Sequence, residues 1–223
     1  MRWMLLVGLV GCAGELTPRA ATTAAACGLD DAPWTGHPFG EAELSPPCIE
    51  ALAADFSVDL PLDPQEATAL AGAHALLAYD WGTVEPGASP LDDVLSDVAD
   101  ITGDDAIGRL AYDYAAHRIH GIEAGSAGEG GAAKYLHLRR VVVWEDVMPP
   151  AAAAGVLVHE ARHGDGERHT HCDDGAVACD DDWQGAYGFE AALMIRGAER
   201  AEGAVASSLS DLASEAAAHV LED

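Results

Sequence analysis

The chain has little positive charge. Only 11 of its 223 residues are lysine or arginine, and lysine occurs once, at Lys134. Against 38 acidic residues this gives a formal net charge of −27. So acidic a protein repels phosphate backbones and anionic headgroups, which excludes nucleic acid and a charge-attracted membrane surface as partners. The same charge favours a cationic ligand, a metal ion or a basic substrate.

Several enzyme motifs are also absent. Without a G-x-S-x-G sequence, a serine hydrolase is unsupported. The glycine-rich segment at 128–131 lacks the Lys-Ser/Thr pair of a phosphate-binding loop, and the cysteines show no C-x-x-C spacing. Aromatic residues make up only 6% of the chain, while 49% of it is apolar and much of that is alanine. This composition favours a helix-rich core in a single domain.

The N-terminal residues show an export pattern. A positive start and a short apolar run end in Leu9-Val10-Gly11-Cys12, which resembles a bacterial lipobox. The resemblance implies a signal peptide at 1–12 and a lipidated Cys12. It also implies attachment to the bacterial cell envelope through lipid alone, on the periplasmic or surface side, with Ala13 favouring the outer membrane. Residues 13–26 are small and polar, so a flexible tether is expected before a domain at 27–223.

Four further cysteines remain in the expected domain, an even number that favours two disulfides in an exported chain. Local pairing, Cys27–Cys48 and Cys172–Cys179, is the simplest of the possible connectivities.

Periodicity predicts an α+β domain that is mainly helical. The valine-rich run favours a strand at 136–144, which we expect in a small β-sheet beside the helix that ends at Gly164. Helical spacing and capping residues predict helices at 48–56, 63–82, 89–100, 103–122, 149–164, 183–203 and 207–222.

The clearest signal is the segment HEARHGDGERH at 159–169. Residues four apart share a helix face, so His159 and His163 can reach one ion, with Glu160 beside them. A third ligand ten residues after the first requires the chain to leave the helix and turn back. Gly166 suits that turn because glycine adopts positive φ without strain. These residues predict a metal site.

The pattern H-E-x-x-H-x-x-G-x-x-H resembles the signature of zincin metallopeptidases, and of their metzincin branch in particular. The resemblance implies a zincin-like fold and Zn²⁺ held by His159, His163 and His169, with Glu160 as general base. It also implies a methionine turn beneath the metal, whereas the downstream Met194 lies in a segment that reads as helix. The third ligand therefore has two alternatives, Glu190 and His171. Tyr187 is the candidate for stabilising an oxyanion.

An acidic segment follows the histidines. The loop Asp173–Asp182 carries five aspartates around the expected Cys172–Cys179 disulfide. Its oxygen ligands suit Ca²⁺, although the spacing is not that of an EF-hand, and a solvated acidic loop is the competing interpretation.

Together these features favour a lipid-anchored zinc-dependent hydrolase, a peptidase acting on peptide or protein substrates of basic character. The alternative is a cell-envelope lipoprotein that binds zinc without catalysis. Glu160 distinguishes the two, because a purely binding site does not need a carboxylate beside its first ligand. Composition and spacing give no oligomeric state.

Overall fold

The computed structural model describes residues 16–29, 44–125, 133–136, 140–143, 148–172 and 178–221. Within these ranges the chain is mostly helical, with eight helices and three short strands. The helices are α1 (Ala20–Ala26), α2 (Pro46–Asp55), α3 (Pro64–Ala78), α4 (Pro90–Thr102), α5 (Ile107–Arg118), α6 (Pro150–His163), α7 (Ala186–Arg200) and α8 (Gly203–Ala217). The strands are β1 (Gly121–Ala124), β2 (Ala133–Leu136) and β3 (Arg140–Val143).

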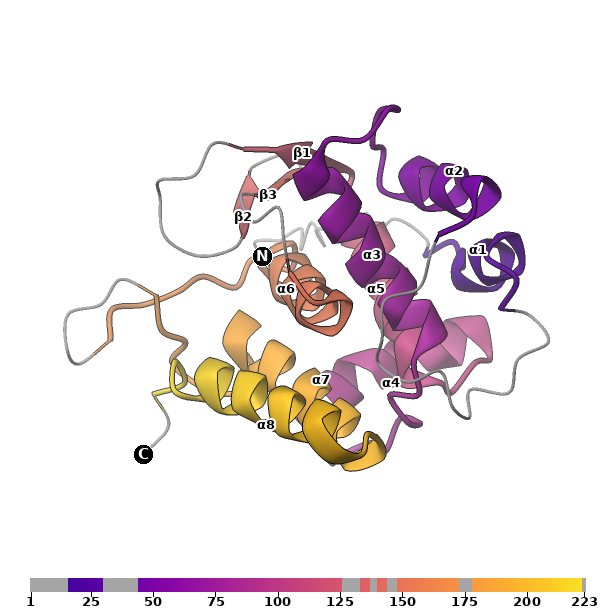
Figure 1. The fold of residues 1–223 in the computed structure, drawn as a ribbon. Coiled ribbons are helices and arrows are strands. Elements are labelled where there is room, and N and C mark those ends of the chain that lie inside the picture. The colour runs from indigo at the N-terminus through magenta and orange to yellow at the C-terminus, as the bar shows by residue number, and fades with distance from the viewer. Residues whose placement is uncertain are drawn as a thin grey trace, which may run out of the picture.

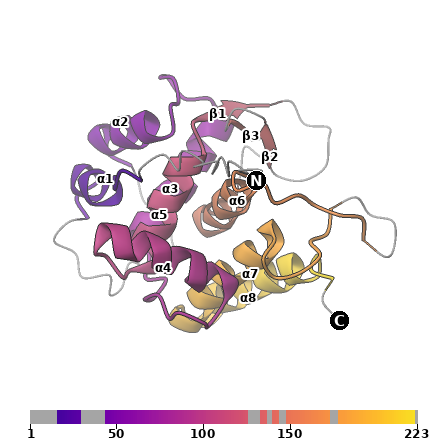
Figure 2. The ribbon, with the colours of Figure 1, turned by 180° about the vertical axis from the view of Figure 1, so that it is seen from behind.

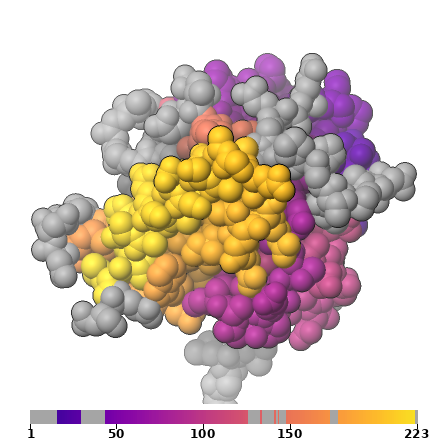
Figure 3. All heavy atoms as spheres, turned by 60° about the horizontal axis from the view of Figure 1, so that its bottom comes forward, coloured from indigo at the N-terminus to yellow at the C-terminus, as the bar shows by residue number. Residues whose placement is uncertain are grey.

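Helix α6 runs through the middle of the molecule (Figure 1). Helices α3 and α5 pack along one side of it and α7 along another, while α8 covers the outer side of α7. The space-filling view shows α8, in yellow, spread over this outer face (Figure 3). Because helices cover it, α6 is buried along most of its length.

Small residues allow the neighbouring helices to approach α6 closely. A Cβ atom added to Gly72 of α3 would lie 2.6 Å from the backbone carbon of Ala153, too close for any real side chain. On the α7 side, a Cβ at Gly155 would lie 2.9 Å from Cε of Met194. The alanine-rich sequence of α6 therefore serves close helix packing, which brings functional side chains from neighbouring helices near its C-terminal end.

The small sheet packs against α3 and α6 (Figure 2). Its strand order is β1-β3-β2, with β1 parallel and β2 antiparallel to β3. The expected single strand at 136–144 is wrong in detail, because residues 133–136 and 140–143 form two paired strands. The valines lie in β3, where Val141 and Val143 are buried. The strand β1 was missed because four residues are too few to show a period.

The expected tether at 13–26 is wrong over its second half. Residues 20–26 form α1, and both Ala20 and Ala24 are buried in the core. The carboxylate of Asp113 accepts the backbone N–H groups of Arg19 at 2.6 Å and Ala20 at 2.9 Å. The folded part therefore begins before residue 27. Alanine has strong helix propensity but gives no amphipathic contrast, so this helix left no periodic signal.

Both expected disulfides are confirmed. Cys27–Cys48 joins the end of α1 to α2, and Cys172–Cys179 closes the loop after the histidine segment. Disulfides of this kind persist in oxidising compartments. No helix in the described ranges has both the length and the apolar character needed to cross a membrane. Cys12 lies outside the described residues.

Candidate metal centre

The histidine segment begins on α6 and ends on a returning turn. His159 and His163 lie on the last turns of α6, which ends at His163. Gly166 then takes a φ of +100°, the left-handed conformation that favours glycine. This reversal brings His169 back against the helix, as the spacing predicts.

The turn is held by Asp165. Its carboxylate accepts hydrogen bonds from the Tyr114 hydroxyl at 2.7 Å, Arg118 Nε at 2.7 Å and Arg162 at 3.1 Å. Burial raises the pKa of Asp165, but these hydrogen bonds and the two guanidinium groups outweigh it and hold the pKa below its ordinary value. The turn is thus fastened to α5 and α6 by a carboxylate that stays ionised.

Three imidazole nitrogens converge on one point. Nε2 of His169 lies 3.2 Å from Nε2 of His159 and 3.1 Å from Nε2 of His163. One ligand atom from each of the three histidines lies within 4.8 Å of the others. Tetrahedral zinc with Zn–N bonds of about 2.0–2.1 Å separates its nitrogen ligands by roughly 3.3 Å. The histidines therefore have the spacing of a preformed metal site.

The other ring nitrogen of each histidine, Nδ1, is hydrogen-bonded to a protein oxygen. His159 Nδ1 lies 3.0 Å from Oε2 of Glu190, and His163 Nδ1 lies 2.8 Å from the backbone oxygen of Glu167. His169 Nδ1 lies 2.9 Å from Oδ1 of Asp180. Each acceptor requires the proton on Nδ1, which leaves the lone pair on Nε2. Three lone pairs facing one another repel unless a cation lies between them, so the donor set fits a divalent metal.

The carboxylates around the cluster set its charge. Burial lowers the pKa of His159, but the hydrogen bond and charge of Glu190, with Glu160 and Asp180 further away, outweigh it and raise the pKa. Burial lowers the pKa of His163 to about 4, and the neighbouring imidazoles contribute. A metal ion would thus compete with a proton more at His159 than at His163.

Tyr187 lies over the cluster from the first turn of α7. Its ring meets that of His159 edge-on at 4.5 Å between centroids and stacks on His219 at 4.4 Å. Burial raises the pKa of Tyr187 to about 12, and nearby carboxylates add to the shift. The phenol therefore remains protonated and able to donate a hydrogen bond at neutral pH.

Glu160 is also near the cluster. Glu160 is buried, with only 4% of its surface exposed. Its charge lies close enough to raise the pKa of both His159 and Tyr187. This places a buried carboxylate within electrostatic range of both His159 and Tyr187.

The alternative third ligands lie elsewhere. Glu190 is on α7 but contacts the far nitrogen of His159, and His171 is exposed and absent from the converging group. Met194 lies within α7 and packs against Gly155, so it forms no turn beneath the histidines. The geometry brings His169 into the cluster in preference to either alternative.

The expected calcium loop is only partly described, since 173–177 lie outside the described residues. Asp180 is 2% exposed and hydrogen-bonded to His169, so it is not a member of a solvated acidic loop. Asp181 and Asp182 are exposed. Among the described aspartates of this loop, the buried one therefore serves the histidine cluster.

Sequence reasoning missed the carboxylates that hold the histidines. Asp180 looked like one of many acidic loop residues, and Glu190 was considered only as a ligand. The Cys172–Cys179 disulfide brings the segments of His169 and Asp180 together, but their register comes from the Thr170–Cys179 bridge, which the sequence does not show. For Glu190 no local pattern exists, because its partner His159 lies on another helix. Asp165 has one local partner, Arg162, but its other partners, Tyr114 and Arg118, lie on α5.

No protein-family model, curated protein or solved structure matches this chain. The function is therefore argued from the site itself.

Proposed function

We propose that this protein is a zinc-dependent hydrolase that cleaves amide bonds. The observation that supports this most is the convergence of three Nε2 atoms at 3.1–3.2 Å, each with its Nδ1 held by an acceptor. The sequence pattern over 159–169 adds the general-base carboxylate that a hydrolase requires.

His159, His163 and His169 are the proposed ligands. Three neutral imidazoles leave the ion its full charge and an open coordination position. Zinc bound there supplies a Lewis acid and lowers the pKa of a coordinated water toward neutrality. Imidazole is a good ligand for several transition metals, and the acceptors on Nδ1 raise the basicity of all three.

Glu160 and Tyr187 are the proposed catalytic residues. The Glu160 carboxylate accepts a proton from the attacking water and donates it to the leaving nitrogen. The Tyr187 hydroxyl, protonated at neutral pH, donates a hydrogen bond to the oxygen that becomes negative. His219, stacked on the Tyr187 ring, limits the movement of that ring.

The proposed substrates are peptides or proteins, and the net charge of −27 favours basic ones. The proposed setting is the bacterial cell envelope, with Cys12 lipidated as the lipobox resemblance implies, on the periplasmic or surface side of the outer membrane. The two disulfides fit such a compartment. Within this proposal the fold is zincin-like, with α6 as the site helix.

The first experiment measures the metal content of the purified protein by mass spectrometry. We expect about one zinc per chain, lost in His163→Ala and retained in His171→Ala, whose exposed histidine lies outside the cluster. Absence of metal from the wild-type protein after zinc is added back would disprove the site.

The second experiment separates catalysis from metal storage. In Glu160→Gln we expect peptide hydrolysis to fall by at least about 10³-fold while zinc content is unchanged. If the wild-type protein holds zinc but hydrolyses no member of a mixed peptide library, the non-catalytic zinc-binding lipoprotein is the better description.

A further inference from the structure

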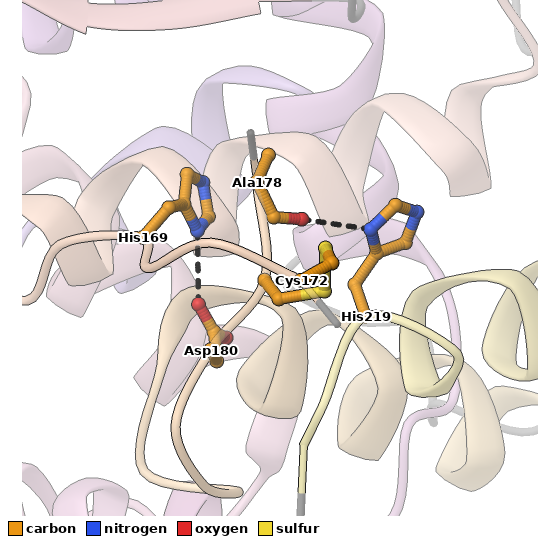
Figure 4. The surroundings of a disulfide bond; sticks show 6 residues. His169, Cys172, Ala178, Asp180 and His219 are labelled. Carbon is orange, nitrogen blue, oxygen red and sulfur yellow. Dashed lines mark hydrogen bonds and ion pairs between the residues drawn. A yellow bond between two sulfur atoms is a disulfide. The ribbon is translucent and has the colours of Figure 1, made fainter. Parts of the chain in front are cut away.

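Asp180 supports the third histidine from outside the recognised motif. Its Oδ1 lies 2.9 Å from Nδ1 of His169, and Figure 4 shows the imidazole directed at the carboxylate. The residue is 2% exposed. The carboxylate is therefore buried and held in this contact by hydrogen bonds to both of its oxygens.

Asp180 is itself fixed on every side. Its Oδ2 accepts the backbone N–H of Tyr187 at 2.6 Å and of Gly188 at 3.3 Å, at the positive end of α7. Its backbone N–H donates to the carbonyl of His219 at 2.7 Å, and its carbonyl accepts from Leu221 at 3.0 Å. One carboxylate thus joins the third histidine to the helix that carries Tyr187.

The contact depends on an isolated antiparallel bridge. Thr170 and Cys179 exchange backbone hydrogen bonds of 2.6 and 3.1 Å, and His169 and Asp180 are their neighbours in the chain. The Cys172–Cys179 disulfide joins the same two segments, with Cys179 itself in the bridge. In Figure 4 the disulfide lies between the His169–Asp180 pair on one side and His219 on the other. His219 is hydrogen-bonded to the Ala178 carbonyl.

We propose that Asp180 is the positioning residue for His169 and that the Cys172–Cys179 disulfide holds it in register, so that metal affinity depends on both. The proposal rests on the metal site of the proposed function but not on hydrolysis. A carboxylate that accepts a hydrogen bond from Nδ1–H fixes the tautomer with its lone pair on Nε2, aims the ring and raises its basicity as a ligand.

Asparagine cannot replace this carboxylate. Both oxygens of Asp180 accept hydrogen bonds, one from His169 and one from the backbone of Tyr187. An amide has one acceptor and one donor group, so in Asp180→Asn one of these N–H groups faces another donor. The variant keeps the shape and loses the charge, which makes it a specific test of positioning.

The test compares Asp180→Asn with Asp181→Asn, a neighbour that is exposed. Zn²⁺ and Co²⁺ affinities are measured by competition with a chelator, and folding is checked by circular dichroism. We expect Asp180→Asn to bind both metals about 10–100-fold more weakly and to alter the visible absorption of the Co²⁺ form. Asp181→Asn should match the wild type. Equal affinities and spectra in all three proteins would overturn the proposal.

A second comparison uses the two disulfides and remains decisive even where Asp180→Asn fails to fold. We expect Cys172→Ser/Cys179→Ser to lower Zn²⁺ affinity several-fold, whereas Cys27→Ser/Cys48→Ser, which cuts the link between α1 and α2, leaves it unchanged. Equal Zn²⁺ affinity in the two double variants would contradict the role of the Cys172–Cys179 disulfide. A wild-type protein that binds no metal would remove the proposed site itself. Tight wild-type binding with no effect of Asp180 would remove only this inference.

Discussion

The carbonyl oxygen of Glu167 accepts a hydrogen bond from Nδ1–H of His163, with 2.8 Å between nitrogen and oxygen. The turn that delivers the third histidine thus also orients the second. The same turn is anchored through Asp165 to Tyr114 and Arg118 of α5. Metal binding should therefore be sensitive to the backbone of this turn as well as to its histidines.

Gly166→Ala tests that sensitivity. The residue has a φ of +100° and no atoms within 4 Å of an added Cβ, so the substitution introduces backbone strain and no collision. We expect a loss of stability of about 1 kcal/mol and weaker zinc binding. Gly87→Ala is the matched control, because Gly87 has a φ of +83° and equal space in a loop remote in sequence. The Gly87→Ala protein should lose a similar amount of stability, measured by denaturant unfolding. Its zinc affinity, measured by chelator competition, should equal that of the wild type.

Tyr187→Phe tests the proposed oxyanion donor. The change keeps the ring that contacts His159 and His219 and removes only the hydroxyl. We expect kcat to fall by about 10²-fold or more, with zinc affinity and melting temperature nearly unchanged. A kcat equal to that of the wild type would show that another group stabilises the developing charge.

Metal removal should lower thermal stability. A metal that binds the folded chain and not the unfolded one stabilises it by about 2.7 kcal/mol at a free concentration 100 times Kd. We expect a chelator to lower Tm by several degrees in the wild type and to have little effect on His163→Ala. The measurement is a thermal melt with and without added zinc; identical melts for the wild-type protein would argue against a site that is occupied in the folded state.

Acid should destabilise the metal-free protein through His163. Its pKa is lowered from 6.5 to about 4 in the folded state. A depressed pKa gives stability that is present above the unfolded value and is lost as pH falls from 6.5 toward 4. The slope is about 1.4 kcal/mol per pH unit and the total is at most about 3.5 kcal/mol, reduced by the partial exposure of the ring.

The comparison for this prediction is His163→Gln, which cannot take up that proton. His159 has a raised pKa, so its contribution is present below its unfolded value and is lost as pH rises through its folded pKa. Because both proteins keep His159 and its partner Glu190, most of the His159 contribution cancels in the difference between their unfolding free energies. What remains reports His163 together with its charge coupling to His159. That difference should shrink on acidification; a constant difference from pH 6.5 to 4 would refute the assignment.

The helices were predictable where capping and spacing agreed. The Ser89-Pro90 start of α4 and the Asp63-Pro64 start of α3 both lie where the sequence places them. The α3 helix ends at Ala78, four residues before the expected Gly82, because Tyr79 and Trp81 turn into the core and are almost fully buried. Where a helix ends is set here by tertiary contacts, which cannot be predicted from local helix propensity.

What the sequence alone determined is the pairing of His159 with His163, the need for a turn at Gly166, and the local disulfides. Each follows from a helical period, a backbone preference or a short loop, all of which are local. The folded structure was needed to find the carboxylates that hold the first and third imidazoles. Glu190 reaches His159 because α6 and α7 pack closely, and Asp180 reaches His169 beside the Thr170–Cys179 bridge. Such hydrogen bonds depend on how segments pack, which spacing along the chain does not record.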